Sequence, residues 1–223
     1  MEKINNILDC LRQDIPVSLA RFNDGEAEAI LSPGCTVARG DQKVPQTLSD
    51  ALREAIQYEQ DNYYIGLPCP DCATGKWYKR IKDLVRPDYP YLTKAVVTTN
   101  RNWKKFIAEF PKAVKGKYVI WVGNQTHNIP NLKESVNLDV AEILNVPAKN
   151  AWSHYDSLIN QEFEDGTIVN LACGPMARVL VRQWFERWPN CSFLDTGSAF
   201  DPFTRNVWHR CHLGTLPPCK ECN

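Results

Sequence analysis

The sequence lacks an excess of either charge, a long apolar run and a leader-like start. Among its 223 residues, 26 Lys and Arg balance 26 Asp and Glu, whereas proteins that coat nucleic acids usually carry a basic excess. No apolar stretch approaches the roughly 20 residues that a membrane-spanning helix needs, and Met1 to Asn6 lack the apolar core of a signal peptide. These absences predict a soluble, cytoplasmic protein with no nucleic-acid partner and no transmembrane segment.

Two further absences concern crosslinks and cofactors. The nine cysteines are an odd number, so a complete disulfide framework is not predicted. No Gly-x-Gly-x-x-Gly motif follows a predicted strand, which does not favour dinucleotide binding. By contrast, 7 Trp and 15 Pro are high counts, and they indicate shaped pockets and many fixed turns.

Strand-like and helix-like segments alternate along the chain. This alternation predicts an α/β fold, with a Rossmann-like, mostly parallel sheet and helices on both of its faces. A loop-rich C-terminal tail is expected over 204–223, after one domain over 1–203. Strands are predicted at 17–22, 63–66, 94–98, 117–123, 141–146 (where a helix is the alternative), 167–172 and 192–195, and helices at 3–13, 27–31, 47–60, 77–85, 103–110, 150–163 and 174–188.

Polar residues and glycines follow three of these strands. Ligands of open α/β sheets bind beyond the carboxyl ends of the strands, so these ends are the predicted site. The first strand ends in Arg21 to Glu26, the sixth in Cys173-Gly174-Pro175, and the last in Asp195 to Ser198 with Asp201 nearby.

Asp24 and Glu26 are the candidate metal ligands. In an extended segment, residues two apart point to the same side, and two carboxylates there can hold Mg²⁺ or Mn²⁺ with positions left open for diphosphate oxygens. The alternative is that Asp24 caps a helix and Glu26 is solvated in its first turn. The sequence alone leaves both open.

Several segments together resemble a known family. Ser18 to Glu26, SLARFNDGE, resembles the RYGDGE signature of the GT-D glycosyltransferases, the DUF1792 family. Asn23 stands where that family usually has Gly. Four further segments follow in the family's order, so the resemblance covers about residues 15–203: they are 97–101, 147–156, 171–180 and 194–197.

The resemblance implies a Rossmann-like glycosyltransferase domain over 1–203, with a nucleotide-sugar donor and a divalent metal. It implies that Asp24 and Glu26 form the metal and diphosphate site, with Arg21 contacting phosphate or supporting the carboxylates. A UDP-sugar is the favoured donor, and a glycan or glycoprotein hydroxyl is the expected acceptor.

Other residues are weighed against simpler roles. Arg101 could hold a diphosphate or could be a surface residue at a helix start. Asp195 and Asp201 are the preferred catalytic bases, against capping or turn roles. His154 is a weaker base candidate, because a packing role is more common on its predicted helix. Gly174 would let a backbone approach the ligand, or would only pack strand against helix.

Two Cys-x₂-Cys pairs, Cys69/Cys72 and Cys219/Cys222, could supply four thiolates to one structural Zn²⁺. Such a site would anchor the tail to the loop at 68–75. Free thiols or disulfides are the alternatives, and the reserve ligands are His209, Cys211 and His212.

The sequence therefore predicts a metal-dependent glycosyltransferase that uses a nucleoside-diphosphate sugar. The first alternative is a nucleotide- or glycan-binding module with a zinc-stabilised tail and no turnover. The second is another Rossmann enzyme, such as a methyltransferase.

Overall fold

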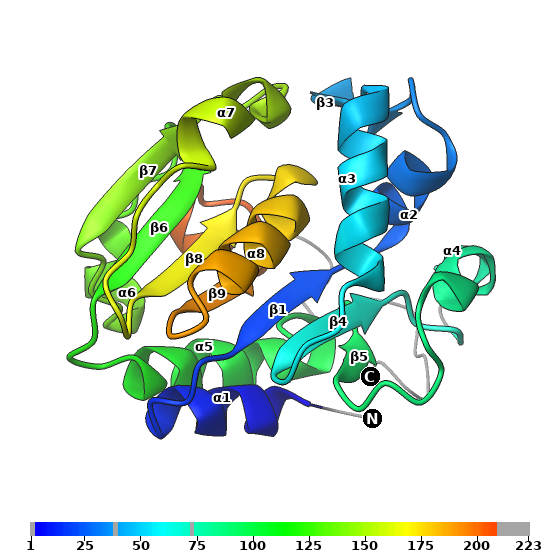
Figure 1. The fold of residues 1–223 in the computed structure, drawn as a ribbon. Helices are drawn as coiled ribbons and strands as arrows, with labels where there is room; N and C mark the ends of the chain where they lie inside the picture. Colours follow the sequence, from blue (N-terminus) through cyan, green and yellow to red (C-terminus); the bar gives the residue numbers. More distant parts are fainter. Residues whose placement is uncertain (1–2, 38–39, 72–73, 209–223) are drawn as a thin grey trace.

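The computed structural model describes residues 3–37, 40–71 and 74–208 (Figure 1). The tail predicted over 204–223 is therefore described only as far as Trp208. Within the described ranges, no helix has both the length and the apolar character needed to cross a membrane.

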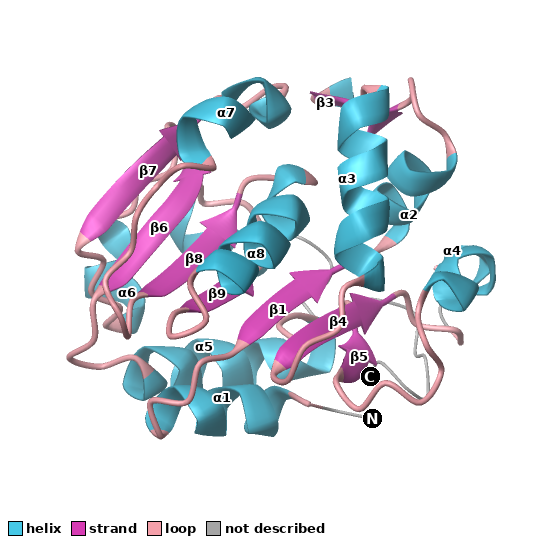
Figure 2. Ribbon diagram, in the orientation of Figure 1, coloured by secondary structure: helices cyan, strands magenta, loops and turns pink. Residues whose placement is uncertain are grey.

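A seven-stranded sheet forms the centre of the molecule, in the order β5-β4-β1-β9-β8-β6-β7 (Figure 2). Every pairing within it is parallel, which confirms the predicted parallel α/β sheet. Its strands are β1 (Ser18–Arg21), β4 (Tyr63–Leu67), β5 (Leu92–Lys94), β6 (Val119–Asn124), β7 (Glu142–Val146), β8 (Ile168–Ala172) and β9 (Ser192–Asp195). A separate antiparallel hairpin joins β2 (Thr36–Val37) and β3 (Gln42–Lys43).

Alternate side chains of the strands enter two different hydrophobic clusters. Ala20 and Ile65 pack with helices on one face, while Leu19 and Tyr64 pack with helices on the other, as the two-residue period of a strand requires. The first face is covered by α2 (Asp24–Leu31), α3 (Gln46–Gln57) and α8 (Met176–Arg187), and the second by α1 (Ile4–Arg12), α5 (Trp103–Ala113) and α6 (Asn131–Val136). Helices thus cover both faces, as predicted. The remaining α-helices of the described ranges are α4 (Gly75–Ile81), α7 (Tyr155–Leu158) and α9 (Asp201–Thr204).

Two predicted elements are wrong. The strand predicted over 94–98 ends at Lys94 and is followed by turns, because the chain there bends to present Ala95 and Thr98 to an arginine of β1. The helix predicted over 150–163 is only a 3₁₀ turn, Ala151–His154, followed by α7. Asn150, just before it, adopts a left-handed φ of 51°. The strand predicted over 141–146 is confirmed as β7.

Candidate functional site

The three strand ends singled out in the sequence are neighbours in space. In the sheet order, β9 lies between β1 and β8, and all three run in the same direction. Their carboxyl ends therefore meet at one edge of the sheet, where α2 and α8 also begin. This edge is the predicted ligand edge of an open parallel sheet.

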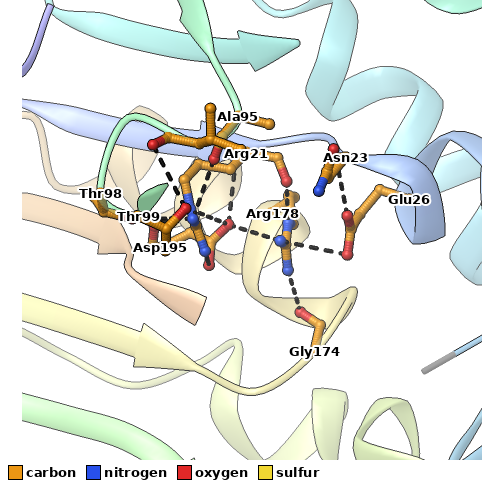
Figure 3. Close-up of polar contacts among 10 residues, drawn as sticks. Arg21, Asn23, Glu26, Ala95, Thr98, Thr99, Gly174, Arg178 and Asp195 are labelled. Atoms are coloured by element: carbon orange, nitrogen blue, oxygen red, sulfur yellow. Dashed lines mark hydrogen bonds and ion pairs between the residues drawn. The ribbon is translucent and has the colours of Figure 1, made fainter. Parts of the chain in front are cut away.

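Arg21, the last residue of β1, points into the protein at this edge (Figure 3). Its Nε donates to the main-chain oxygen of Asp195 over 2.7 Å. Its Nη1 donates to the Thr98 hydroxyl at 2.9 Å and to the Ala95 carbonyl at 3.1 Å. Arg21 thus ties β1 to β9 and to the turn after β5. The sequence predicted that Arg21 contacts phosphate or supports Asp24 and Glu26. The carboxylate that it contacts here is that of Asp195, so both predicted roles stay predictions.

Arg178 is the functional-looking residue that the sequence reasoning missed. It is the third residue of α8, and its Nε donates to the Arg21 carbonyl at 2.6 Å. Its Nη1 donates to the Gly174 carbonyl at 2.7 Å. The sequence does contain one indication of its role. A cation in the first turn of a helix interacts unfavourably with the helix dipole, so its presence indicates a specific anionic partner.

Arg178 joins two carboxylates on different elements. Its Nη2 lies 2.9 Å from Oδ2 of Asp195 and 3.3 Å from Oε1 of Glu26. Asp195 has no exposed surface, while Arg21, Arg178 and Glu26 keep less than a tenth of theirs. Two guanidinium groups therefore balance two carboxylates in a buried cluster, as buried charges require. We call Arg21, Glu26, Arg178 and Asp195 the charge network.

Burial and the charges of the network shift the pKa values of Arg178 and of the nearby Cys173. Burial lowers the pKa of Arg178, but the charges of Asp195 and Glu26 outweigh burial and raise that pKa above its ordinary value. Burial, with a smaller contribution from Asp195, raises the pKa of Cys173 to about 12. A raised pKa keeps the Cys173 thiol neutral near pH 7, which does not favour a role as nucleophile.

Asp24 and Glu26 do not lie in an extended segment, and that expectation is wrong. Asn23 is the N-cap of α2, so Asp24 and Glu26 are its first and third residues. Positions two apart in a helix point about 200° apart around its axis. Glu26 is buried and Asp24 is exposed. The helical alternative was right about the first turn, but Asn23 takes the cap position and Glu26 is not solvated.

A divalent metal held jointly by Asp24 and Glu26 does not fit this arrangement. Oε2 of Glu26 accepts the Asn23 amide at 3.0 Å in a capping box, and Oε1 pairs with Arg178. Asp24 extends from a different side of the same helical turn, so the two carboxylates do not converge. Within the described residues, no group of three or more His, Cys, Asp and Glu forms a metal site. The Mn²⁺ or Mg²⁺ requirement stays a prediction, without this ligand pair.

Two glycines shape the edge. Gly174 has a φ of +65°, and a Cβ there would make only ordinary contact with Gln42. Its requirement is therefore the left-handed backbone, which also turns its carbonyl toward Arg178. Gly197, at φ +50°, lies directly against the guanidinium of Arg21.

The other residues that the sequence proposed as bases or diphosphate ligands lie in different environments. Asp195, a preferred base, is wholly buried in the charge network. Asp201 begins α9 and pairs with Arg205 at 3.4 Å. Arg101 is exposed in a 3₁₀ turn after β5, and His154 is exposed at the end of another. These positions do not test the predicted roles in proton transfer or diphosphate binding, so those roles stay predictions.

Of the four cysteines predicted to bind zinc, the structure describes Cys69. Cys69 is buried in the loop after β4. Its three predicted partners and the reserve ligands lie outside the described residues: Cys72, Cys219, Cys222, His209, Cys211 and His212. The zinc site stays a prediction.

Comparisons with known proteins bear on the fold. No protein-family profile matches the chain, and no curated protein matches it. Three solved structures do resemble it. A selenomethionine-substituted domain of unknown function 1792 has a TM-score of 0.67 and 17% identity, over 90% of this chain and 79% of that one.

The second structure, described as a domain of unknown function 1792 with a distinct glycosyltransferase fold, has a TM-score of 0.66 and 18% identity, over 90% of this chain and 79% of that one. The third is described as a new glycosyltransferase (DUF1792) from Streptococcus sanguinis. It has a TM-score of 0.65 and 19% identity, over 93% of this chain and 85% of that one. The sequence resemblance is thereby confirmed at the level of architecture: this chain has the fold of the DUF1792 domains.

Proposed function

We propose that the protein is a glycosyltransferase that moves a sugar from a nucleoside-diphosphate sugar to an acceptor hydroxyl. The observation that supports this most directly is the meeting of β1, β8 and β9 with the starts of α2 and α8 at one edge. The likeness in fold to proteins described as glycosyltransferases adds to it. A UDP-sugar is the proposed donor, and a glycan or glycoprotein is the proposed acceptor.

The donor's diphosphate would lie at the starts of these two helices. Backbone amides at a helix N-terminus and the helix dipole both favour negative charge. Arg21 and Arg178 would act indirectly, because their charges are already paired with Asp195 and Glu26. Their role in this proposal is to fix the ends of β1 and β9 and the Gly174 turn, against which the donor is bound.

Asp24 is the proposed catalytic carboxylate, since it is exposed at the start of α2. In the transfer, the acceptor oxygen attacks the anomeric carbon and the bond from that carbon to the diphosphate oxygen breaks. The bonding electron pair leaves with the nucleoside diphosphate, and Asp24 takes the acceptor proton. No step of this proposal uses a divalent cation.

The test is a panel of UDP-, GDP- and dTDP-sugars incubated with mixed glycan acceptors, with and without Mn²⁺. We expect release of one nucleoside diphosphate, together with an acceptor whose mass has increased by one sugar. Nucleotide binding without release or product would contradict the proposal and favour the non-catalytic binding module. Binding of S-adenosylmethionine in place of a nucleoside diphosphate would favour a methyltransferase.

A further inference from the structure

Arg178 is placed where one cation serves two carboxylates from different parts of the fold. Glu26 comes from the first turn of α2, and Asp195 is the last residue of β9. Both lie against the same nitrogen, Nη2, at 3.3 and 2.9 Å. The two other guanidinium nitrogens are held by the carbonyls of Arg21 and Gly174. All three nitrogens therefore have defined partners, and the guanidinium is fixed in place.

The two carboxylates need this cation because both are buried. Two like charges held around one point in a poorly solvated interior raise each other's energy, and a positive charge between them removes the repulsion. Arg21 contributes a second positive charge, but its ion pair is with Asp195 at 3.5 Å. Figure 3 shows Arg178 between Arg21 and Glu26, and among the described residues Arg178 is the cation paired with Glu26.

We propose that Arg178 is a positioning residue that supplies the fixed positive charge between Glu26 and Asp195, and that Glu26 is consequently not a ligand of a divalent metal. The proposal rests on the proposed function only in treating this edge as the donor site. In this proposal, the two carboxylates of the Asp-Gly-Glu segment have different roles. Glu26 fixes the start of α2 through Asn23 and Arg178, and the exposed Asp24 is left to face the ligand.

The contacts of Glu26 make metal binding there unfavourable for two reasons. Each of its carboxylate oxygens already has a partner, Asn23 N–H for Oε2 and Arg178 for Oε1. A metal bound to either oxygen would also lie within a few ångströms of a guanidinium that has no neutral form near pH 7. Removing Arg178 reverses the situation, because Glu26 then loses its cationic partner, and Arg21 alone remains beside Asp195.

The experiment measures Mn²⁺ binding alone, by titration calorimetry and by the electron paramagnetic resonance signal of free Mn²⁺. Wild type is compared with Glu26→Gln, Arg178→Gln, Arg178→Lys and the double variant Glu26→Gln/Arg178→Gln. Arg182→Gln is the matched control, since Arg182 lies one turn further along α8 and pairs with Glu186 near the surface.

We expect wild type and Glu26→Gln to bind Mn²⁺ equally, within about twofold. Arg178→Gln should gain at least about tenfold in Mn²⁺ affinity, and Mn²⁺ should raise its melting temperature. The double variant should lose that gain, while Arg178→Lys and Arg182→Gln should behave as wild type. A purely structural role for Arg178 would lower stability without creating a metal site.

Two results would overturn the proposal. One is a tenfold loss of Mn²⁺ affinity in Glu26→Gln, which would make Glu26 a metal ligand in the native protein; this holds even if Arg178→Gln fails to fold. The other is a folded Arg178→Gln protein that gains no Mn²⁺ affinity. Neither result depends on sugar transfer, so a failed transferase assay leaves this test intact, and a working transferase does not rescue the proposal.

Discussion

The backbone of Gly197 lies against the side chain of Arg21 so closely that a Cβ atom on residue 197 would overlap Nη2 of the guanidinium. Gly197 also has a left-handed φ of +50°. Gly197 lies two residues after the end of β9 and begins the 3₁₀ turn Gly197–Phe200. The position of Arg21, and through it of Asp195, depends on the absence of a side chain here.

Substitution of Gly197 by Ala tests this contact. The left-handed backbone alone costs a non-glycine residue about 1–2 kcal/mol, and the forced displacement of a buried side chain adds about 1–3 kcal/mol. Gly166→Ala is the matched control, since Gly166 has a φ of +83° and nothing within 4 Å of its Cβ position. In urea unfolding, we expect Gly197→Ala to lose about 2 kcal/mol more than Gly166→Ala. Equal losses would mean that Arg21 moves aside at no cost.

Asp195 is expected to contribute stability rather than to take the acceptor proton. Asp195→Asn leaves two buried guanidinium groups short of their shared carboxylate, and breaking a buried pair in this way costs about 3–5 kcal/mol. Asp139→Asn is the control, because its pair with Lys133 is exposed, and such pairs contribute under about 1 kcal/mol. The measurement is urea unfolding at pH 7. If Asp195→Asn keeps wild-type stability but loses turnover, Asp195 is a catalytic group after all.

Asp24→Asn should have the opposite profile. Loss of one exposed carboxylate from the first turn of α2 costs about 0.3–1 kcal/mol, whereas loss of a general base lowers turnover about 10²–10⁴-fold. Glu28→Gln, in the same helix, is the control and should keep its activity. Turnover and thermal melts are measured side by side on all three proteins. Wild-type turnover in Asp24→Asn would remove this residue from the mechanism.

The sequence was sufficient to predict the sheet and the edge where the candidate site residues meet. Alternation of apolar strands and amphipathic helices predicted the parallel sheet, and the polar strand ends at Arg21, Gly174 and Asp195 predicted the three strands that meet. This worked because both signals are local. A strand's period and the residue after its last apolar position can be read without knowing the neighbours.

Whether the side chains of Asp24 and Glu26 point to the same side or to different sides could not be predicted in the same way. Extended and helical conformations are both open to Asn-Asp-Gly-Glu, and the choice made in the structure goes with a contact from far along the chain. Arg178 lies 157 positions after Arg21, to whose carbonyl it donates a hydrogen bond. Arg178 also forms the ion pair with Glu26. Sequence patterns report periodicity, not the partner that a buried carboxylate will find.

The missing helix over 150–163 has a similar cause. Gln42 of β3 accepts the Ala151 amide at 2.9 Å and donates to the Ala148 carbonyl at 3.1 Å. The Asn150 side chain in turn accepts the Lys43 amide at 2.9 Å. These contacts with a hairpin more than a hundred residues away accompany the left-handed φ of Asn150, and the α-helix begins only at Tyr155.

His127, in the loop after β6, gives the protein a predictable response to acid. Burial, with a smaller effect from Arg205, lowers the pKa of His127 from 6.5 to about 4. Its Nδ1 is buried with no hydrogen-bond partner among the described residues, and its ring meets Trp121 edge to face at 6.3 Å. Protonation would thus place an unsatisfied charge beside an aromatic ring and a guanidinium.

The direction of the pH dependence follows from the lowered pKa. The unfolded chain takes up a proton near pH 6.5 and the folded protein only near pH 4. The contribution of neutral His127 to stability is therefore complete above about pH 6.5 and is lost as pH falls toward 4. Because the ring keeps some exposure to solvent, we expect about 1 kcal/mol of loss between pH 7 and pH 5, about half of what full burial would give.

Urea unfolding of wild type and His127→Gln at both pH values measures this difference. His154→Gln, which removes an exposed histidine, should keep the wild-type slope. Should His127→Gln lose as much stability as wild type on acidification, carboxylates rather than His127 carry the acid response, and the loop after β6 opens to water more readily than its burial indicates.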